Sequence, residues 1–108
     1  MARKKLETLT EQMYYVLLSL SEEARHGYGI MQYVSQLTVG RVTIGAGTLY
    51  ALLGRFEEEG LITLTEYKEG RKYYLLSRWG RQVLEEEYSR LRQQVADGAG
   101  LLDKEERQ

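Results

Sequence analysis

The sequence of 108 residues contains no cysteine and no proline. Without cysteine, a disulfide framework and a zinc–thiolate site are excluded. The sequence also has no run of eighteen apolar residues and no apolar signal-peptide core. We therefore expect a cytoplasmic protein with no membrane partner.

Histidine is almost absent, because His26 is the only one. A catalytic histidine needs a nucleophile or a carboxylate partner, and the sequence has no such pairing motif, no metal-ligand cluster and no phosphate-binding loop. We predict that the chain is not an enzyme and that it binds no cofactor and no metal. His26 is interpreted as a packing or capping residue at the start of a helix.

Net charge is also small, −1 at pH 7, which argues against a nonspecific polybasic nucleic-acid binder. The distribution of charge is more informative than its sum. The stretch 40–56 has only two charged residues, Arg41 and Arg55, and Lys68, Arg71 and Lys72 form a second basic group. Two local basic surfaces on a near-neutral protein are compatible with binding in a DNA groove. The acidic runs 57–59 and 85–87 are interpreted as solvated helix faces; the second run could also limit pairing of the last helix to one register.

Hydrophobic residues make up 43% of the chain and charged residues 29%, which fits one folded domain. A domain this small has a modest core and often depends on a partner chain. An apolar stripe along an exposed helix would indicate such a partner, because contiguous apolar surface is rarely left in contact with water.

The stretch 43–62 has the clearest pattern in the sequence. Its apolar residues recur at i, i+3, i+4 and i+7, which is the spacing of one stripe on an α-helix. These residues are Leu49, Leu52, Leu53 and Phe56. Gly60 is predicted to end the helix, and Leu61-Ile62 to begin a β-strand.

The opposite face of this predicted helix carries few large side chains. The residues that point away from the stripe or flank that face are Gly47, Thr48, Tyr50, Ala51, Gly54, Arg55 and Glu58. A mid-helix glycine costs about 1 kcal/mol relative to alanine, so Gly54 does not serve helix stability. Either the small residues are merely tolerated at the surface, or they let another body approach the helix backbone closely. A DNA major groove, about 12 Å wide, admits a helix in this way.

Two helices are predicted before this one. Helical periodicity begins at Thr8, where Thr8 or Thr10 can act as N-cap and residues 8–11 have the spacing of a capping box. The apolar side of the first helix is formed by Met13, Val16, Leu17 and Leu20. After a polar break at 21–25, the run His26-Gly27-Tyr28-Gly29 leads into a second helix, whose apolar residues are Ile30, Met31, Val34 and Leu37.

After the third helix, the β-like runs 61–67 and 72–76 flank the glycine-bearing segment 68–71, which predicts a β-hairpin. Ser77 can cap a last helix, and Asp97-Gly98-Ala99-Gly100 is predicted to end it, with the apolar pair Leu101-Leu102 beyond. The last helix carries a coiled-coil-like seam with steps of 4, 3 and 4 residues. The seam consists of Leu84, Tyr88, Leu91 and Val95.

Three helices, a hairpin and a long helix predict a mainly α (α+β) fold, a winged helix-turn-helix with a β-hairpin wing. In that fold the third helix enters the major groove and the wing lies beside it over the DNA backbone. We expect residues 1–77 to form the DNA-binding domain, with 1–7 as a flexible arm. Residues 78–102 are expected to form a C-terminal dimerisation helix, and 103–108 a disordered tail.

Five segments in this order resemble the PadR family of bacterial transcriptional regulators, in its short subtype with one C-terminal helix. The segments are 9–18, 25–30, 47–50, 58–62 and 71–74, and the resemblance covers about residues 8–95. It implies a homodimeric winged helix, usually a repressor, often relieved by a small molecule or a stress signal. Two departures are noted: Ala46 stands where the family frequently has proline, and Gly54 where relatives often have a larger polar residue.

These considerations give two sets of candidate residues. The predicted DNA-binding residues are Tyr28, Arg41, Thr48, Tyr50, Ala51, Gly54, Arg55, Lys68, Arg71 and Lys72. The predicted dimer-interface residues are Met13, Leu84, Tyr88, Leu91 and Val95. For Tyr50 the alternative is a half-buried side chain that bridges helices, and for Arg71 and Lys72 it is a merely solvated turn. Trp79, the only tryptophan, is interpreted as a packing residue rather than a ligand-stacking one.

The leading functional hypothesis is a homodimeric, sequence-specific repressor that binds an inverted-repeat operator in double-stranded DNA. A small-molecule effector that relieves repression is part of this hypothesis. The alternative is a winged helix that serves protein–protein contact and has no operator.

Overall fold

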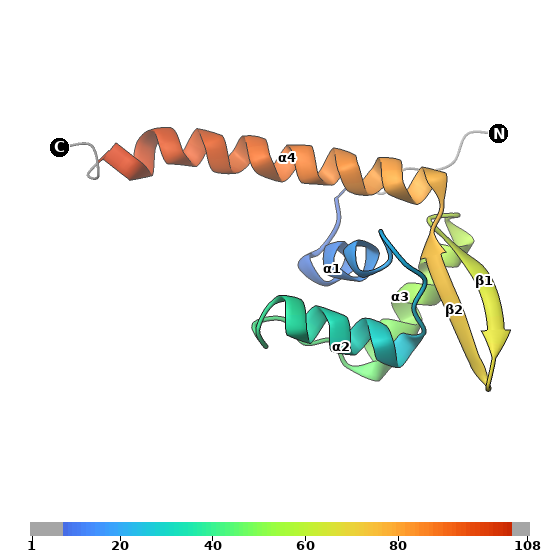
Figure 1. Ribbon diagram of the computed structural model, residues 1–108. Coiled ribbons are helices and arrows are strands. Elements are labelled where there is room, and N and C mark those ends of the chain that lie inside the picture. Colours follow the sequence, from blue (N-terminus) through green and yellow to red (C-terminus); the bar gives the residue numbers. More distant parts are fainter. Residues whose placement is uncertain (1–7, 105–108) are drawn as a thin grey trace.

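The computed structural model describes residues 8–104 and has the predicted winged-helix order of elements (Figure 1). The elements are α1 (Glu11–Ser19), α2 (Gly27–Leu37), α3 (Ala46–Glu58), β1 (Ile62–Lys68), β2 (Arg71–Leu76) and α4 (Arg78–Leu102). The expected N-terminal arm, residues 1–7, lies outside the described residues, as do residues 105–108 of the expected tail.

Helix α1 begins at a threonine cap, but not at the one that the sequence spacing suggested. The Thr10 hydroxyl accepts a hydrogen bond from the Met13 N–H at 3.1 Å, and the Met13 sulfur accepts one from the Thr10 N–H at 3.4 Å. The capping box predicted for residues 8–11 is therefore wrong. Glu11 is instead the first helical residue, where its negative charge is favourable to the helix dipole.

The predicted end of α3 at Gly60 is confirmed. Gly60 has φ +75°, a left-handed conformation that favours glycine. The N–H of Leu61 donates to the carbonyl of Phe56 at 2.8 Å, and the N–H of Gly60 donates to that of Glu57 at 3.1 Å. This pair of bonds is a Schellman motif, and it turns the chain from α3 directly into β1.

Strands β1 and β2 form the predicted hairpin. Lys68 pairs with Arg71 across a two-residue turn, in which Glu69 and Gly70 have φ values of 52° and 75°. Two left-handed residues define the type I′ turn that suits the twist of a hairpin. Ile62 is buried, but Leu64 is exposed because the hairpin extends away from the core.

The hairpin is anchored to the helices at its base. The N–H and carbonyl of Arg25 exchange two 3.0 Å bonds with those of Tyr74. The hydroxyl of Ser77, the predicted cap of α4, donates to the carbonyl of Gly60 and accepts a bond from the Gly80 N–H at 2.9 Å. A Cβ at Gly80 would lie only 1.9 Å from the Leu61 carbonyl oxygen, so α4 crosses the start of the hairpin at a point that only glycine permits.

Helix α4 does not end where its glycines suggested. It continues through Asp97-Gly98-Ala99-Gly100 to Leu102, and Asp103 and Lys104 add a 3₁₀ turn. Glycine lowers helix propensity by about 1 kcal/mol, but it ends a helix only where it adopts a left-handed conformation. Neither Gly98 nor Gly100 has a positive φ.

The core lies between α1, α2, α3, the base of the hairpin and the first turns of α4. Met13 and Leu84 belong to it, with exposed fractions of 4% and 5%. Each side chain is already covered by its own chain, so their assignment to the dimer interface stays a prediction that burial in the protomer does not favour. Trp79 packs against the core, as expected.

Glu87 corrects the interpretation of residues 85–87 as a solvated face. Only 7% of Glu87 is exposed. Its carboxylate accepts hydrogen bonds from Nε and Nη2 of Arg90, at 2.8 and 2.5 Å, and from the N–H of Leu9. The hydrogen bonds from Arg90 are the main reason why the pKa of Glu87 is lowered. Glu87 thus connects α4 to the segment before α1.

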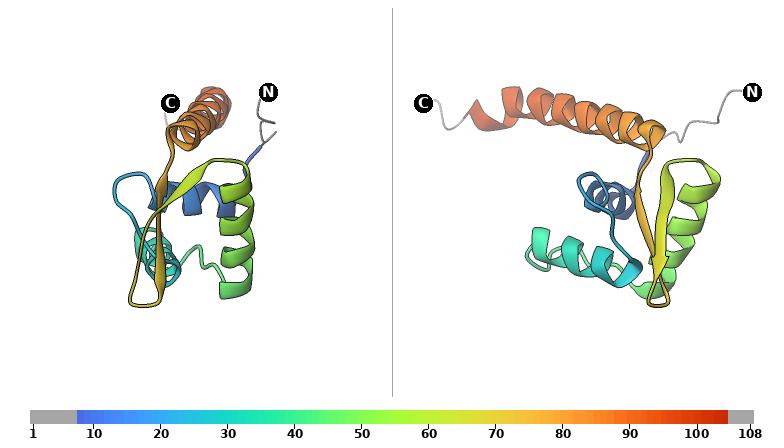
Figure 2. Two further views of the ribbon diagram at one scale, coloured as in Figure 1. Left: turned by 90° about the vertical axis from the view of Figure 1, so that its right-hand side faces the viewer. Right: turned by 45° about the vertical axis from the view of Figure 1, so that its right-hand side comes forward.

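Two further views show how the elements are placed (Figure 2). Helix α4 lies along one side of the molecule, while the hairpin tip and the start of α3 lie at the opposite end. A surface formed by the start of α3 and the hairpin tip is therefore separated from the surface of α4.

Candidate nucleic-acid interface

The outward face of α3 is open, as its small residues predicted. Thr48, Ala51 and Gly54 are exposed. A Cβ added at Gly54 would meet no atom within 4 Å, and the same is true at Gly47. A second body can therefore approach the backbone of α3 closely along this face.

A cavity of about 360 Å³ lies between the start of α2, α3 and the hairpin tip. It is lined by His26, Gly27, Tyr28, Tyr50, Tyr67, Gly70, Arg71, Lys72 and Tyr74. Four residues predicted from the sequence therefore meet in one place although they come from three elements. These are Tyr28, Tyr50, Arg71 and Lys72. We call this space the α2–wing cavity.

His26 belongs to this cavity, and sequence reasoning missed that. Its predicted capping role is confirmed, because its Nδ1 accepts a 3.1 Å hydrogen bond from the Gly29 N–H. Its Nε2 lies 3.1 Å from Nη1 of Arg71, and its ring stands edge-on to that of Tyr73, with centroids 5.2 Å apart. Burial and, next, the Arg71 charge lower the pKa of His26. The sequence did contain one indication of this position, because His26 lies only two residues before Tyr28, which was predicted to contact DNA.

Gly27 allows α2 and α3 to touch beside the cavity. A Cβ at Gly27 would lie 2.6 Å from the Tyr50 hydroxyl, so a larger residue here would displace the end of this tyrosine side chain. Tyr50 is nevertheless 58% exposed, so its ring bridges the helices while remaining accessible. The alternative of a side chain that bridges helices thus describes the position of Tyr50, although it is more exposed than half-buried, and its contact with DNA stays a prediction.

Three of the predicted cations lie outside the cavity and have acidic neighbours, and for Arg55 and Lys68 that neighbour is close in the sequence. Nε of Arg55 is 3.5 Å from a Glu59 oxygen, and Nζ of Lys68 is 3.8 Å from a Glu66 oxygen. Both pairs are exposed and water-screened, so they hold the side chains weakly. Either cation can exchange its carboxylate for another anion at little cost.

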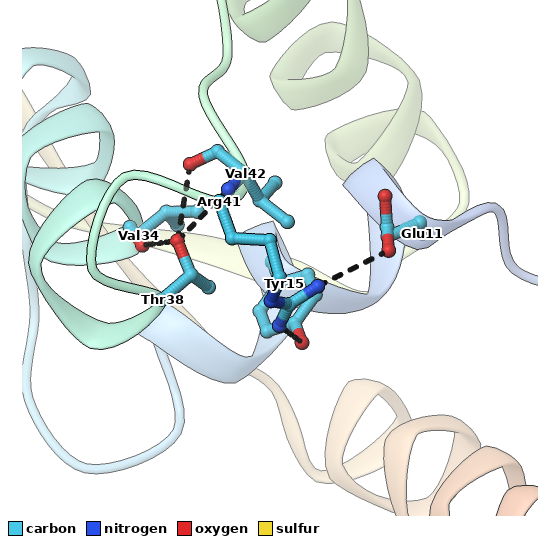
Figure 3. A network of polar contacts seen from close by, with 6 residues as sticks. All are labelled: Glu11, Tyr15, Val34, Thr38, Arg41 and Val42. Atoms are coloured by element: carbon cyan, nitrogen blue, oxygen red, sulfur yellow. Dashed lines mark hydrogen bonds and ion pairs between the residues drawn. The ribbon is translucent and has the colours of Figure 1, made fainter.

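Arg41 does not join the other candidate residues. Its Nη2 donates to the Tyr15 hydroxyl at 2.9 Å, and its Nη1 lies 3.7 Å from a Glu11 oxygen, so the guanidinium is held against α1 (Figure 3). The hydrogen bond to Tyr15 is the main reason why the pKa of Arg41 is raised. Arg41 stays a predicted DNA contact, but an intramolecular network already occupies it.

The same view shows how the connection between α2 and α3 is fixed (Figure 3). The Thr38 hydroxyl donates to the carbonyl of Val34 at 2.9 Å and accepts a bond from the Val42 N–H at 3.0 Å. Because Thr38 is buried, these bonds satisfy polar groups that water cannot reach. The turn that sets α3 against α2 is thereby held at its base.

Beyond Glu87, every residue in the described part of the chain is exposed or half-buried. The apolar seam of α4 is part of this surface: Tyr88 and Val95 are 51% and 71% exposed, and Leu91 is half-buried. Leu102, seven residues after Val95, continues the seam and is 81% exposed, so its length exceeds the predicted four residues. A shallow cavity of about 420 Å³ lies along its C-terminal part, beside Val95 and Leu102.

Within residues 8–104 no cluster of three His, Cys, Asp or Glu side chains could hold a metal ion. In the same range, no helix is both long and apolar enough to cross a membrane.

The sequence and the fold both match known regulators. The model of the transcriptional regulator PadR-like family matches residues 16–86, which is most of the winged helix and the start of α4. The chain belongs to this family. PadR-like proteins are transcriptional regulators rather than enzymes, so the prediction that the chain is not an enzyme is confirmed.

Individual PadR-like relatives extend this comparison. The transcriptional regulator YqjI of Escherichia coli is 37% identical over 71 residues, which cover 66% of this chain and 34% of YqjI. The chain thus matches about a third of that relative. A PadR-family regulator from Eggerthella lenta has a similar structure, with a TM-score of 0.70 and 31% identity over 84% of this chain and 80% of that one. Bacillus subtilis PadR, crystallised in complex with operator DNA, has a TM-score of 0.65 and 25% identity over 71% of this chain and 47% of that one.

Proposed function

We propose that this PadR-like chain is a sequence-specific DNA-binding regulator. One observation carries the proposal: the open face of α3 belongs to the same helix that contributes Tyr50 to the basic, tyrosine-rich cavity beside the wing. The crystal structure of Bacillus subtilis PadR with operator DNA supports it, since the two folds are similar. The net charge of −1 is no obstacle, because the charges that would face DNA are local.

In this proposal the two parts of the interface have different tasks. Helix α3 enters the major groove with Ala51 and Gly54 toward the base edges, while Thr48 lies near its N-terminus, where backbone N–H groups favour a phosphate. Arg71 and Lys72 at the wing contact phosphates, which strengthens binding but conveys no sequence information.

We further propose that the active form is a homodimer joined through the exposed seam of α4. Tyr88, Leu91 and Val95 form an apolar stripe along a helix that extends past the other elements (Figure 1). Left in water, such a stripe is unfavourable, and a second copy would cover it. A two-fold dimer places two copies of α3 on an inverted repeat.

Repression is the expected mode of action, because a dimer seated on a promoter excludes other proteins from it. A small-molecule or stress signal that alters the α4 pairing would change the spacing of the two reading helices and so release the DNA. The shallow cavity beside Val95 and Leu102 is where such a molecule could reach the α4 seam.

The test is a titration of the purified chain against a labelled duplex from upstream of its own gene and against a scrambled duplex of equal length. We expect the upstream duplex to bind at least about tenfold more tightly at moderate salt, the effect of 1.4 kcal/mol of discrimination. Equal binding of both duplexes would contradict sequence specificity. No binding to either at micromolar concentrations would favour the alternative, a winged helix that contacts another protein.

A further inference from the structure

The α2–wing cavity brings together hydrogen-bond donors. Arg71 and Lys72 line it from the wing, His26 from the start of α2, and Tyr28 and Tyr50 add hydroxyl groups. The residues that line this cavity in the described structure include no Asp or Glu. A site built from cations and neutral donors suits an anion.

The protonation of His26 makes this argument sharper. Nδ1 accepts the hydrogen bond of the Gly29 N–H, and a nitrogen that accepts cannot carry a hydrogen. The neutral imidazole must therefore carry its hydrogen on Nε2. Nε2 in turn faces Nη1 of Arg71 at 3.1 Å, and a guanidinium can only donate.

Two donors thus face each other, and neither can accept from the other. If Nε2 accepted from Arg71 instead, Nδ1 would carry the hydrogen and the Gly29 N–H would lose its acceptor. In the first arrangement the Arg71 guanidinium lacks an acceptor at Nε2, and in the second the Gly29 N–H lacks one at Nδ1. In the first arrangement, an oxygen from a bound ligand could accept hydrogen bonds from both Nε2–H and Arg71. We propose that one phosphate of the DNA backbone binds in the α2–wing cavity, held jointly by the Nε2–H of His26 and the guanidinium of Arg71.

This inference rests on the proposed function and names the contact that connects α2 to the wing. His26 acts as a neutral donor here, because protonation of Nδ1 would break the cap of α2. Gly27 helps to position the Tyr50 hydroxyl at the edge of the cavity, since any larger residue would push that side chain away. A phosphate in this place would bridge α2 and the wing through one oxygen or two.

The first test uses the fact that His26 is the only histidine, so imidazole signals in long-range ¹H–¹⁵N spectra need no assignment. In the free protein we expect the neutral tautomer with hydrogen on Nε2. On addition of a short duplex, the Nε2–H signal should shift. The Nδ1–H tautomer in the free protein would overturn the proposal, as would an unchanged imidazole when α3 amides shift on DNA addition. Inorganic phosphate at equal ionic strength tests the source: a full shift with the ion alone would overturn assignment to the DNA backbone.

The second test measures binding to duplex DNA at several salt concentrations. His26→Asn keeps an N-cap oxygen but loses the Nε2–H. It should weaken binding roughly two- to tenfold, as for one neutral hydrogen bond, without changing the slope of log K against log salt. Arg71→Gln should weaken binding and make the slope shallower by about 0.9 for each lost contact. Because both residues hold one phosphate, the double variant should lose less than the product of the two single losses.

Lys68→Gln is the matched control, because Lys68 is a wing cation outside the cavity. It should change the salt slope as Arg71→Gln does, yet combine with His26→Asn multiplicatively. A His26→Asn chain that melts and binds like the parent overturns the phosphate site alone. A parent chain that binds no duplex at any salt concentration overturns the proposed function, and the site with it.

Discussion

Gly54 is the residue on which the proposed reading of DNA depends most. A Cβ there meets open space, so Gly54→Ala should raise the free energy of unfolding by about 1 kcal/mol through helix propensity. Gly54→Leu should also fold normally, but its side chain would stand between the backbone of α3 and the base edges. We expect Gly54→Leu to lose binding to the upstream duplex far more than binding to scrambled DNA.

Titrations of both Gly54 variants against the two duplexes, with a thermal melt of each, decide this point. Gly54→Ala is the control for helix stability, since it adds only one carbon. Normal binding of the upstream duplex by Gly54→Leu would show that the small residues are merely tolerated at the surface.

Glu87 gives a prediction about stability and pH. Its folded-state pKa is lowered, chiefly by the hydrogen bonds from Arg90, so its ionised form stabilises the fold above the unfolded pKa of about 4.3. That contribution is lost as the pH falls through the folded-state pKa. Glu87→Gln should cost roughly 1 kcal/mol at neutral pH, a modest value because the Arg90 side chain is 41% exposed.

Urea denaturation of the parent and of Glu87→Gln between neutral and acidic pH measures this difference. The two stability curves should converge at low pH, where the carboxyl is protonated in both states. Glu85→Gln, on the exposed face of the same helix, is the control and should change stability less. A constant difference between parent and Glu87→Gln at all pH values would refute the assigned role.

At the scale of elements, the connection between α2 and α3 contains local strain. Val39 has φ +53°, which is unfavourable for a β-branched residue, and 91% of it is exposed. Val39→Asn should raise the free energy of unfolding by about 1 kcal/mol, because asparagine tolerates the left-handed conformation. Leu37→Asn, an exposed change at the same helix end, should alter stability by less than about 0.5 kcal/mol. Denaturant unfolding that shows no gain for Val39→Asn would contradict this account of the turn.

Local chemistry explains which elements could be predicted from the sequence. The apolar stripe of α3, its end at Gly60, the cap at Ser77 and the hairpin turn each depend on residues close together in the chain. The course of α4 beyond Asp97 does not, because a glycine ends a helix only if its backbone turns left-handed. The capping box at residues 8–11 was wrong because two threonines offer the same cap chemistry, and the helix begins one residue after Thr10 rather than after Thr8.

The candidate site could be predicted in part. Tyr28, Tyr50, Arg71 and Lys72 were identified by residue type and position on their elements, and the structure brings them together. His26 was assigned only its capping role, because its approach to Arg71 spans 45 residues of sequence. The partners of Arg41 lie on α1, at least 26 residues away in the sequence, so its position could not be predicted either. For Glu87 the partner Arg90 is local, and it was the burial of the carboxylate that the sequence did not indicate.

At the scale of the whole molecule, the seam of α4 predicts self-association. Leu91→Glu would place a charge in the seam and should shift the chain toward monomer. Gln82→Glu adds the same charge at an exposed position on the opposite face of α4 and should leave the association unchanged. Sedimentation velocity at tens of micromolar compares the three proteins. A monomeric parent would contradict the dimer.

The two proposed interfaces lie apart in the molecule, since α4 lies on the side away from the hairpin tip and the start of α3 (Figure 2). A dimer joined through α4 can therefore present both copies of α3 to one duplex. Leu91→Glu should accordingly weaken binding to the upstream duplex much more than binding of the single subunit to random DNA.

Hydroxyl-radical footprinting of the chain on its own upstream DNA tests the central claim most directly. The account predicts two protected blocks related by a dyad, with centres about 34 Å, one helical turn, or a multiple of it apart. Protection that lacks a dyad, or no protection at concentrations where the dimer is formed, would contradict it.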